Sequence, residues 1–368
     1  MRVTLIISSL SSGGAERVIT TMANYWARKG WQITLLTMDN GGEPPFYDLH
    51  TAVSHHPLGV ASVPETPFQG FVNNIRRLKV LRRAIRVATP QVVISFIDRT
   101  NVLVLASTLG THVPIVVSER IDPRHCMIDE PWATLRRLLY PFATRLVVQT
   151  EDVLSYFSAS VRGHSRVIPN PVLPPTERAS QELLCDKPRE QKTLLAVGRL
   201  VDQKGFDLLL RAFAHVAPAH PDWSLEIWGD GSQRQSLKRL IEEVGLAGCA
   251  QLPGRTKHPF NVMRQADLFV MPSRYEGFPN ALCEAMACGL PVVSFDCPSG
   301  PRAIVRDGID GVLVPAGDVS ALADALNRLL SDEVERQRLA LRAPEVRKRF
   351  GLKQVMDMWE SLIQEVLL

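Results

Sequence analysis

The feature that most constrains this chain is an alternation of short Val-, Ile- and Leu-rich runs with longer segments of helical period. The apolar residues of each run follow one another almost without polar breaks, which is typical of parallel strands covered by helices on both faces. The pattern therefore predicts an α/β fold built on parallel sheet. In the first half of the chain the runs stand at residues 2–9, 31–38, 91–97, 113–119 and 145–150.

The same alternation restarts after a change of composition. Residues 171–191 are rich in proline and charge and have no period, which indicates a linker. With 368 residues the chain is also too long for one small core. We therefore expect two Rossmann-like domains facing a central cleft, with ligands beyond the carboxyl ends of the strands. The second series of apolar runs stands at residues 192–200, 224–231, 250–254, 266–273, 291–296 and 311–317.

These transitions set the expected domain boundaries. We place an N-terminal domain at residues 1–172, a linker at 173–191 and a C-terminal domain at 192–350. Residues 351–368 contain an amphipathic segment of helical period. We expect this segment to form a helix that packs back on the N-terminal domain.

Charge and cysteine usage narrow the class of protein. Residues 1–175 carry 18 Lys+Arg and 12 Asp+Glu, a net charge of +6 (18 − 12), and the remaining residues carry 24 and 26, a net of −2. An anionic partner is therefore expected at the N-terminal half.

The first apolar run is too short to span a bilayer, so the expected location is the cytoplasm. No C-x-x-C pair is present, and we expect buried, reduced thiols at Cys126, Cys185, Cys249, Cys283, Cys288 and Cys297.

Two glutamates, Glu276 and Glu284, bracket a predicted helix start in the stretch EGFPNALCE. Pro279 suits the first helical position, where its missing N–H costs nothing. The positive end of the helix dipole would bind phosphate there. Glu284 lies on the same helical face, where its carboxylate can accept two ribose hydroxyls, and Glu276 would meet groups beyond the phosphates. The phosphate-binding backbone N–H groups would belong to Asn280, Ala281 and Leu282.

Two basic residues in the stretch AVGRLVDQKG can neutralise a diphosphate. Arg199 follows the first strand of the second series, and Lys204 precedes the next helix. A charge-assisted hydrogen bond from each contributes about 1.5–3 kcal/mol. Either residue alone could be a solvated loop charge, but beside the glutamate pair they indicate a sugar-nucleotide site.

These motifs resemble those of a known family. The stretches GRLVDQKG, IWGDG, LPGR and EGFPNALCEAMACGLPVV are similar to sequences of the retaining glycosyltransferases of family 4, and the resemblance spans most of the chain. It implies the two-domain GT-B fold and transfer of a hexose or N-acetylhexosamine from a nucleotide-sugar. Uridine is the expected nucleoside because it is the common one in such donors. The resemblance further implies that the N-terminal domain binds the acceptor and the C-terminal domain binds the nucleotide-sugar. No cofactor is expected.

The resemblance also implies roles for individual residues. Arg199 and Lys204 would bind the diphosphate and Glu276 the sugar hydroxyls, and these three are the expected catalytic residues. For retention, the family is thought to use same-face attack in which a leaving-phosphate oxygen takes the acceptor's proton. No metal is expected, because no two aspartates are separated by one residue and a D-x-D motif is absent. The expected donor-binding residues are Gly14, Arg255, Thr256, Phe278, Asn280, Ala281, Leu282 and Glu284.

Two segments of the N-terminal half are candidates for the acceptor. Glu119 and Arg120 follow a predicted strand, where many family members carry a histidine, so no general base is carried over and a salt-bridged loop is the alternative. The stretch 70–88 predicts a helix with one apolar face and an adjacent basic stripe. Its apolar residues are Phe71, Ile75, Leu78, Leu81 and Ile85, and its basic stripe is Arg76, Lys79, Arg83 and Arg86.

The basic stripe is either a solvated face or a contact to an anionic lipid head group, which the charge excess favours. The stretches SGGAERV, SERIDP and DCPSGPRAIV resemble bacterial transferases that extend lipid-linked glycans. This resemblance implies a polyprenyl-diphosphate-linked glycan as acceptor, at the cytoplasmic face of the membrane.

Several alternatives stay open or are disfavoured at this point. A nucleotide-sugar-binding protein without catalysis, or a transferase with a soluble or protein acceptor, would use the same motifs. An NAD-dependent oxidoreductase is disfavoured because SLSSGGAERV lacks G-x-G-x-x-G. A nucleic-acid partner is not expected, since no aromatic residues interleave with the basic stripe.

Overall fold

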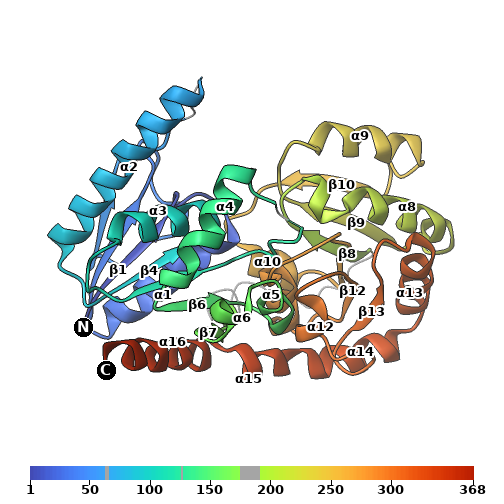
Figure 1. The fold of residues 1–368 in the computed structure, drawn as a ribbon. Coiled ribbons are helices and arrows are strands. Elements are labelled where there is room, and N and C mark those ends of the chain that lie inside the picture. The colour runs from blue at the N-terminus through green and yellow to red at the C-terminus, as the bar shows by residue number, and fades with distance from the viewer. Residues whose placement is uncertain (63–65, 126, 175–190) are drawn as a thin grey trace. The chain divides into compact units, whose positions relative to one another are not determined.

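The computed structural model describes residues 1–62, 66–125, 127–174 and 191–368. They form two compact units, one of Met1–Asn170 with Val355–Leu368 and one of Pro171–Gln354 (Figure 1). Most of the predicted linker, 173–191, lies outside the described residues. The C-terminal helix belongs to the first unit from Val355 onward. The residues that precede Val355, back to Pro171, belong to the second unit.

The first unit is built on a parallel sheet in the order β3-β2-β1-β4-β5-β6-β7. Strands β1 and β4 are neighbours in the sheet, and the chain proceeds outward from them in both directions. Parallel sheets of this order bind ligands beyond the carboxyl ends of the strands, where the order reverses. The strands are β1 (Arg2–Ile7), β2 (Gln32–Thr37), β3 (Val53–Pro57), β4 (Val92–Phe96), β5 (Ile115–Ser118), β6 (Arg145–Val148) and β7 (Ser165–Val167).

Helices cover this sheet on both faces. The C-terminal helix α16 (Leu352–Leu367) packs Trp359, which is fully buried, against Phe96 of β4, with ring centroids 6.3 Å apart. Ion pairs from Glu360 to Lys29 (2.8 Å) and from Glu365 to Arg145 (2.5 Å) fix the same helix. The other helices of the unit are α1 (Gly14–Arg28), α2 (Pro67–Ala88), α3 (Asp98–Thr108), α4 (Glu130–Leu139), η1 (Tyr140–Phe142), α5 (Glu151–Leu154) and α6 (Ala159–Arg162).

The second unit repeats the plan with a parallel sheet in the order β10-β9-β8-β11-β12-β13. Successive strand residues face opposite sides: Leu194 of β8 belongs to the core under α8, α9 and α13, and Leu195 to the core under α11. Both cores exclude water, which explains the unbroken apolar runs. The strands are β8 (Lys192–Val197), β9 (Trp223–Trp228), β10 (Ala250–Gly254), β11 (Leu268–Met271), β12 (Val292–Asp296) and β13 (Val312–Pro315).

Most helices of the second unit begin just after a strand. The helices are η2 (Asp202–Lys204), α8 (Phe206–Val216), η3 (Ala217–Ala219), α9 (Arg234–Glu243), α10 (Pro259–Arg264), α11 (Asn280–Ala287), α12 (Pro301–Ile304), α13 (Val319–Ser331), α14 (Glu333–Arg342), η4 (Ala343–Glu345) and α15 (Val346–Phe350).

The predicted fold class is confirmed by these two sheets, and each predicted apolar run overlaps a strand. Two strands of the first unit were not predicted. The sequence of β3, VSHHP, is mostly polar and partly exposed at one sheet edge, and β7 at the other edge has three residues. Edge strands have a neighbour on one side only and are often short or polar, so they lack the apolar runs of central strands.

Helix α2 differs from the expectation of one continuous apolar face. Its C-terminal half buries Leu81 and Ile85, but Phe71 is 64% and Ile75 38% exposed. The N-terminal part of α2 projects beyond the other described elements of its unit (Figure 1), so these elements leave the two side chains partly uncovered.

Four of the six cysteines lie among the described residues, and all four are unpaired. Cys283 and Cys297 are buried, and burial raises the pKa of the Cys297 thiol to about 12, which makes it unreactive. Cys126 and Cys185 lie outside the described residues. In the part of the chain that the structure describes, no helix is both long enough and apolar enough to cross a bilayer.

Candidate sugar-nucleotide site

The predicted donor-site residues of the second unit come from loops at the carboxyl ends of β8, β10 and β11 and from helix α11. Strands β8 and β11 are hydrogen-bonded neighbours where the strand order of the sheet reverses. The loop after β8 carries Arg199 and Lys204, and the loop after β11 carries Glu276. Reversal of strand order separates the crossover helices and leaves room for a ligand between the two loops.

Lys204 and Glu276 are in direct contact. The Nζ of Lys204 lies 2.5 Å from Oε1 of Glu276, and the hydroxyl of Ser273 donates a hydrogen bond of 2.6 Å to the same oxygen. Glu276 is 5% exposed, so its carboxylate is nearly surrounded by protein. Two donors on Oε1 fix the carboxylate and leave Oε2 as an acceptor for a further hydroxyl.

Helix α11 begins one residue later than predicted. Pro279 is the N-cap, with φ −74° and ψ 94°, and the first helical residue is Asn280. Proline has no side-chain oxygen with which to cap the helix, and no side-chain cap is present. The first N–H groups therefore receive no cap from Pro279, and they lie at the positive end of the helix dipole.

The remaining predicted donor residues of α11 and its entry differ in burial. Glu284 is 6% exposed on the second turn of the helix, four residues beyond the half-buried Asn280. Phe278 and Leu282 are buried in the core under α11, and Phe278 makes an edge-to-face contact with Phe350 at 5.4 Å. Because its ring faces the core, Phe278 can meet a ligand only through its backbone.

Arg199 differs from Lys204 in being exposed, and no carboxylate among the described residues pairs with it. Arg255 and Thr256 follow β10, where Arg255 lies 3.7 Å from Asp230. Arg255 is exposed, and the hydroxyl of Thr256 accepts a hydrogen bond of 3.0 Å from the backbone N–H of His258. The roles predicted for these three residues remain predictions.

Two glycines bring the loops of this site together. Gly205 has φ +62°, and a Cβ built there would lie 2.0 Å from the carbonyl oxygen of Pro272. Gly300 has φ +126°, and a Cβ there would lie 2.7 Å from Cδ of Pro279. Both positions therefore require glycine for backbone conformation and for close approach.

The sequence interpretation did not identify Ser273, Arg274 or Asp207 as parts of the site. Arg274 donates to both carboxylate oxygens of Asp207, at 2.9 and 2.8 Å. The sequence indicates these residues only by their nearness to predicted site residues. Asp207 follows Lys204 by three residues, and Arg274 precedes Glu276 by two.

In the first unit, Glu119 lies beyond the carboxyl end of β5 and is 1% exposed. It accepts a 2.6 Å hydrogen bond from the hydroxyl of Tyr140 and lies 3.8 Å from Arg136. Burial, together with the charge of Asp98, raises the pKa of Glu119 to about 7. The acceptor-binding role of Glu119 stays a prediction.

Arg120 stacks on an aromatic ring. Its guanidinium carbon lies 3.6 Å from the ring centroid of Phe96, and Nη1 donates to Asn170 at 2.8 Å. The Nε and Nη2 atoms are buried and have no hydrogen-bond partner among the described residues, and burial lowers the pKa of Arg120 to about 9. Gly14, the other predicted site residue of this unit, is the first residue of α1 after β1.

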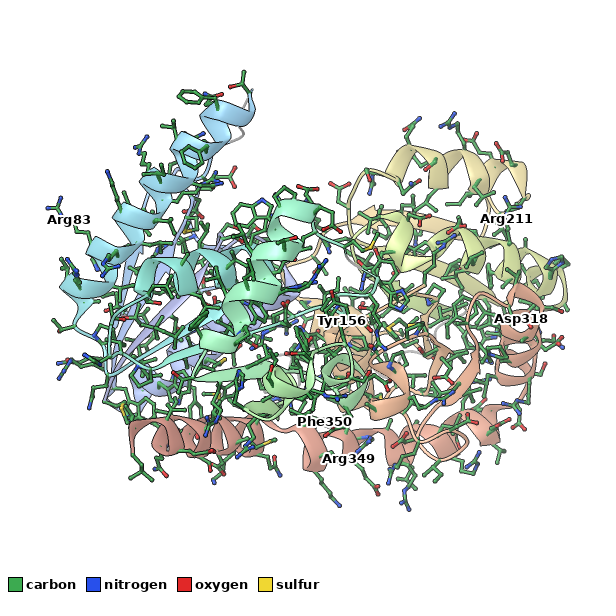
Figure 2. The ribbon with its side chains drawn as sticks, viewed as in Figure 1. Arg83, Tyr156, Arg211, Asp318, Arg349 and Phe350 are labelled. Atoms are coloured by element: carbon green, nitrogen blue, oxygen red, sulfur yellow. The ribbon has the colours of Figure 1, made fainter. Side chains whose placement is uncertain are left out.

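The six basic residues of α2 fall into two groups. Arg77 bonds to the carbonyl oxygens of Val60 and Ser62, and Arg82 to those of Ser107 and Leu109, so these two hold the helix in place. The four residues of the predicted basic stripe are exposed and form no ion pair within the described residues; Figure 2 shows Arg83 on the outer side of α2. They are Arg76, Lys79, Arg83 and Arg86.

Within the described residues, no group of three His, Cys, Asp or Glu side chains is placed to hold a metal ion. Lys204 contacts Glu276 directly, Arg199 lies in the same loop after β8 as Lys204, and the N-terminus of α11 follows the loop that carries Glu276. Such positive groups stabilise a diphosphate leaving group by direct charge contact.

Comparison with known proteins adds independent evidence. The family model for Glycosyltransferase Family 4 matches residues 12–174, and the model for Glycosyl transferases group 1 matches residues 185–346. A Campylobacter jejuni protein named GalNAc-alpha-(1->4)-GalNAc-alpha-(1->3)-diNAcBac-PP-undecaprenol alpha-1,4-N-acetyl-D-galactosaminyltransferase is 28% identical over 368 residues, covering 100% of this chain and 99% of that protein.

Solved structures agree at the level of the fold. A sucrose-phosphate synthase from Thermosynechococcus elongatus has a TM-score of 0.85 at 20% identity, covering 99% of this chain and 98% of the other. HepE from Anabaena in complex with UDP has a TM-score of 0.78 at 18% identity, covering 99% and 100%. Since the two family models divide most of the sequence between the two Rossmann-like units, this chain belongs to glycosyltransferase family 4 and has the GT-B fold.

Proposed function

We propose that this glycosyltransferase moves a hexose or N-acetylhexosamine from a UDP-sugar to a polyprenyl-diphosphate-linked glycan, with retention of anomeric configuration. The observation that carries the proposal is the contact of Lys204 with Glu276 beside the start of α11. The cation and the positive end of the helix are suited to bind the two phosphates of a sugar diphosphate. The carboxylate is suited to accept hydrogen bonds from the hydroxyls of the sugar.

Each group has a distinct task in this proposal. Arg199, Lys204 and the N-terminal N–H groups of α11 bind the diphosphate and stabilise the negative charge that grows on it as the bond to the sugar breaks. Glu276 accepts hydroxyls of the sugar through Oε2, and Glu284 accepts those of the ribose. UDP is supported by the HepE complex and by the resemblance, which implies uridine.

The chemical step needs no covalent bond to the protein. The acceptor hydroxyl attacks the anomeric carbon on the face that the diphosphate leaves, the bond from that carbon to the phosphate oxygen breaks, and a phosphate oxygen takes the acceptor's proton. The protein contributes orientation and charge stabilisation, which lower the barrier without a nucleophile.

The acceptor assignment is supported by α2 and by the Campylobacter relative, whose name specifies an undecaprenol diphosphate acceptor. The exposed basic stripe provides charge complementary to lipid phosphates. At 100° per residue, the exposed Phe68, Phe71, Val72 and Ile75 share a face that overlaps this stripe. We infer that α2 contacts an anionic membrane surface, with its apolar N-terminal turns in the interface and its basic residues at the phosphates.

The proposal is tested with a panel of UDP-, GDP- and ADP-sugars and a polyprenyl-diphosphate-linked acceptor, in the presence of a metal chelator. We expect transfer from a UDP-sugar, insensitive to the chelator, and an anomeric configuration of the product equal to that of the donor. UDP-sugar binding without turnover on any acceptor would favour a non-catalytic binding protein. Transfer to a soluble glycan or a protein, with none to the lipid-linked acceptor, would replace the acceptor assignment.

A further inference from the structure

We propose that Arg274 and Asp207 are positioning residues that set the distance between Lys204 and Glu276. The inference rests on the proposed function, because it concerns the same sugar-nucleotide site. It assigns a role to two residues that act through Lys204 and Glu276 and do not themselves bind the sugar nucleotide.

Arg274 joins the two loops of the site through its side chain. Its guanidinium donates two hydrogen bonds to Asp207, of 2.9 Å to Oδ1 and 2.8 Å to Oδ2. The same guanidinium donates to the carbonyl oxygen of Asp202 at 2.7 Å. One side chain from the loop after β11 therefore holds the start of η2 and the first turn of α8, and Lys204 lies between these two points.

Backbone groups of the two loops are joined as well. The N–H of Arg274 donates to the carbonyl oxygen of Gln203 at 2.8 Å, and Nε2 of Gln203 donates to the carbonyl oxygen of Tyr275 at 2.9 Å. Gln203 immediately precedes Lys204, and Tyr275 immediately precedes Glu276. The residues that precede the catalytic pair are thus fixed to one another.

The pair of Arg274 and Asp207 is suited to positioning because it is geometrically restrictive. Both oxygens of the carboxylate and two nitrogens of the guanidinium are engaged, an arrangement that a lysine cannot reproduce. The side chains are 31% and 38% exposed, so solvent screens the pair only in part. Burial raises the pKa of Asp207, but the hydrogen bonds and charge of Arg274, together with hydrogen bonds from backbone N–H groups, lower that pKa below its ordinary value, which keeps the carboxylate charged at neutral pH.

Loss of this pair would leave the folded unit intact but loosen the site. The Lys204–Glu276 contact spans two loops, so relative motion of the loops changes the distance between the groups that bind the diphosphate and the sugar. A displacement of about 1 Å in a catalytic group can lower turnover on the order of 100-fold. The expected loss is therefore in kcat more than in KM, since Arg199 and α11 still anchor the diphosphate.

The experiment compares Arg274→Gln, Arg274→Lys and Asp207→Asn with the wild-type protein, using the UDP-sugar that the wild type turns over. We expect kcat to fall about 10- to 100-fold in all three variants, with KM changed by about threefold or less. Arg274→Lys keeps the charge but not the two-point geometry, so a loss in this variant separates positioning from simple charge. The control is Arg328→Gln, which removes an ion pair to Glu335 at 3.4 Å elsewhere in the unit.

A double-mutant cycle distinguishes positioning from general destabilisation. If Arg274 acts through Glu276, then Arg274→Gln lowers kcat about 10- to 100-fold in the wild-type background but less than about threefold in a Glu276→Gln background. Equal losses in both backgrounds would contradict the inference. So would a kcat within about twofold of wild type in Arg274→Gln.

A third readout does not depend on catalysis. Hydrogen exchange of the backbone amides in 201–205 and 273–277 should accelerate together in Arg274→Gln while the core strands β8 and β11 stay protected. Unchanged exchange in both segments overturns the positioning role even if no sugar donor is ever found. Absence of turnover in the wild type, by contrast, contradicts the proposed function and leaves the exchange result to decide this inference.

Discussion

Lys204 and Glu276 meet at 2.5 Å between Nζ and Oε1, although 72 residues separate them in the chain. They meet because β8 and β11 are neighbours in a parallel sheet and both residues lie beyond the carboxyl ends of these strands. The sheet order thus brings together a cation and a carboxylate that the sequence places far apart.

Removing the charge of Glu276 or of Arg199 should reduce the rate of sugar transfer far more than the free energy of unfolding. We predict that Glu276→Gln and Arg199→Gln each lower kcat/KM about 100- to 1000-fold, as expected for a preorganised charge contact. Steady-state kinetics and thermal unfolding of the same samples measure the two effects. Arg211→Gln, an exposed site on α8 labelled in Figure 2, is the control. Turnover near that of the control in either variant would remove the residue from the mechanism.

Gly205 provides a stability test of the loop contact. We predict that Gly205→Ala destabilises the second unit by about 3 kcal/mol, because a Cβ would lie 2.0 Å from the carbonyl oxygen of Pro272 and φ is +62°. Gly245 has φ +75°, but a Cβ at that position would have no atom within 4 Å, so Gly245→Ala should cost only about 1 kcal/mol. Urea unfolding measures both. Equal costs would mean that close approach at Gly205 is unimportant.

The motifs of the second unit were predictable because their chemistry is local. Pro279 before an apolar helical run indicates a helix start, and the structure moves that start by one residue. The strand series was equally predictable, since central strands buried on both faces leave an unbroken apolar run. The sequence could not predict which side chains form hydrogen bonds with one another. No local pattern connects Ser273 to Glu276 or Arg274 to Asp207, because those contacts depend on side-chain direction.

Helix α2 shows a second kind of feature that the sequence could not predict, namely how much of a helix the rest of the protein covers. Its period of apolar residues predicted one packed face, yet Phe71 and Ile75 are exposed while Leu81 and Ile85 are buried. Periodicity identifies which residues share a face but not how far along the helix the rest of the protein extends. Likewise, Glu119 follows a strand as expected, but the sequence did not indicate that Tyr140 would cover it.

Glu119 should make stability depend on pH. Its folded pKa is about 7 against an ordinary value of 4.5, so between these values the folded protein keeps a proton that the unfolded chain has released. The free energy of unfolding therefore falls as pH rises through this window. We predict that Glu119→Gln removes this fall, which is on the order of 3 kcal/mol at full effect. Urea unfolding between pH 5 and 8 measures the difference, and identical pH profiles for the two proteins would contradict it.

The surface of α2 should bind anionic vesicles through two separable contributions. We predict that changing the four residues of the basic stripe to Gln weakens binding to vesicles containing anionic lipid roughly 100-fold or more at low salt. The double variant Phe68→Ser/Phe71→Ser should weaken it by a factor that persists at high salt, because the lost contribution is apolar. The basic stripe comprises Arg76, Lys79, Arg83 and Arg86.

Vesicle sedimentation measures both effects, and a matched variant controls for net charge. It changes four exposed basic residues of the second unit to Gln and should bind vesicles like the wild type. Stability should not fall in Phe68→Ser/Phe71→Ser, since these side chains are 77% and 64% exposed. If the matched variant loses as much binding as the stripe variant, attraction is nonspecific and α2 is a solvated face. The matched residues are Arg211, Lys238, Arg239 and Arg328.

The most direct measurement is calorimetric titration of the protein with UDP, UMP and uridine, repeated on the double variant Arg199→Gln/Lys204→Gln. We predict that UDP binds at least about 100-fold more tightly than uridine, and that the double variant loses most of this difference because each charge-assisted hydrogen bond is worth about 1.5–3 kcal/mol. Equal affinity for UDP and uridine, or unchanged UDP binding in the double variant, would contradict a diphosphate site between β8 and α11.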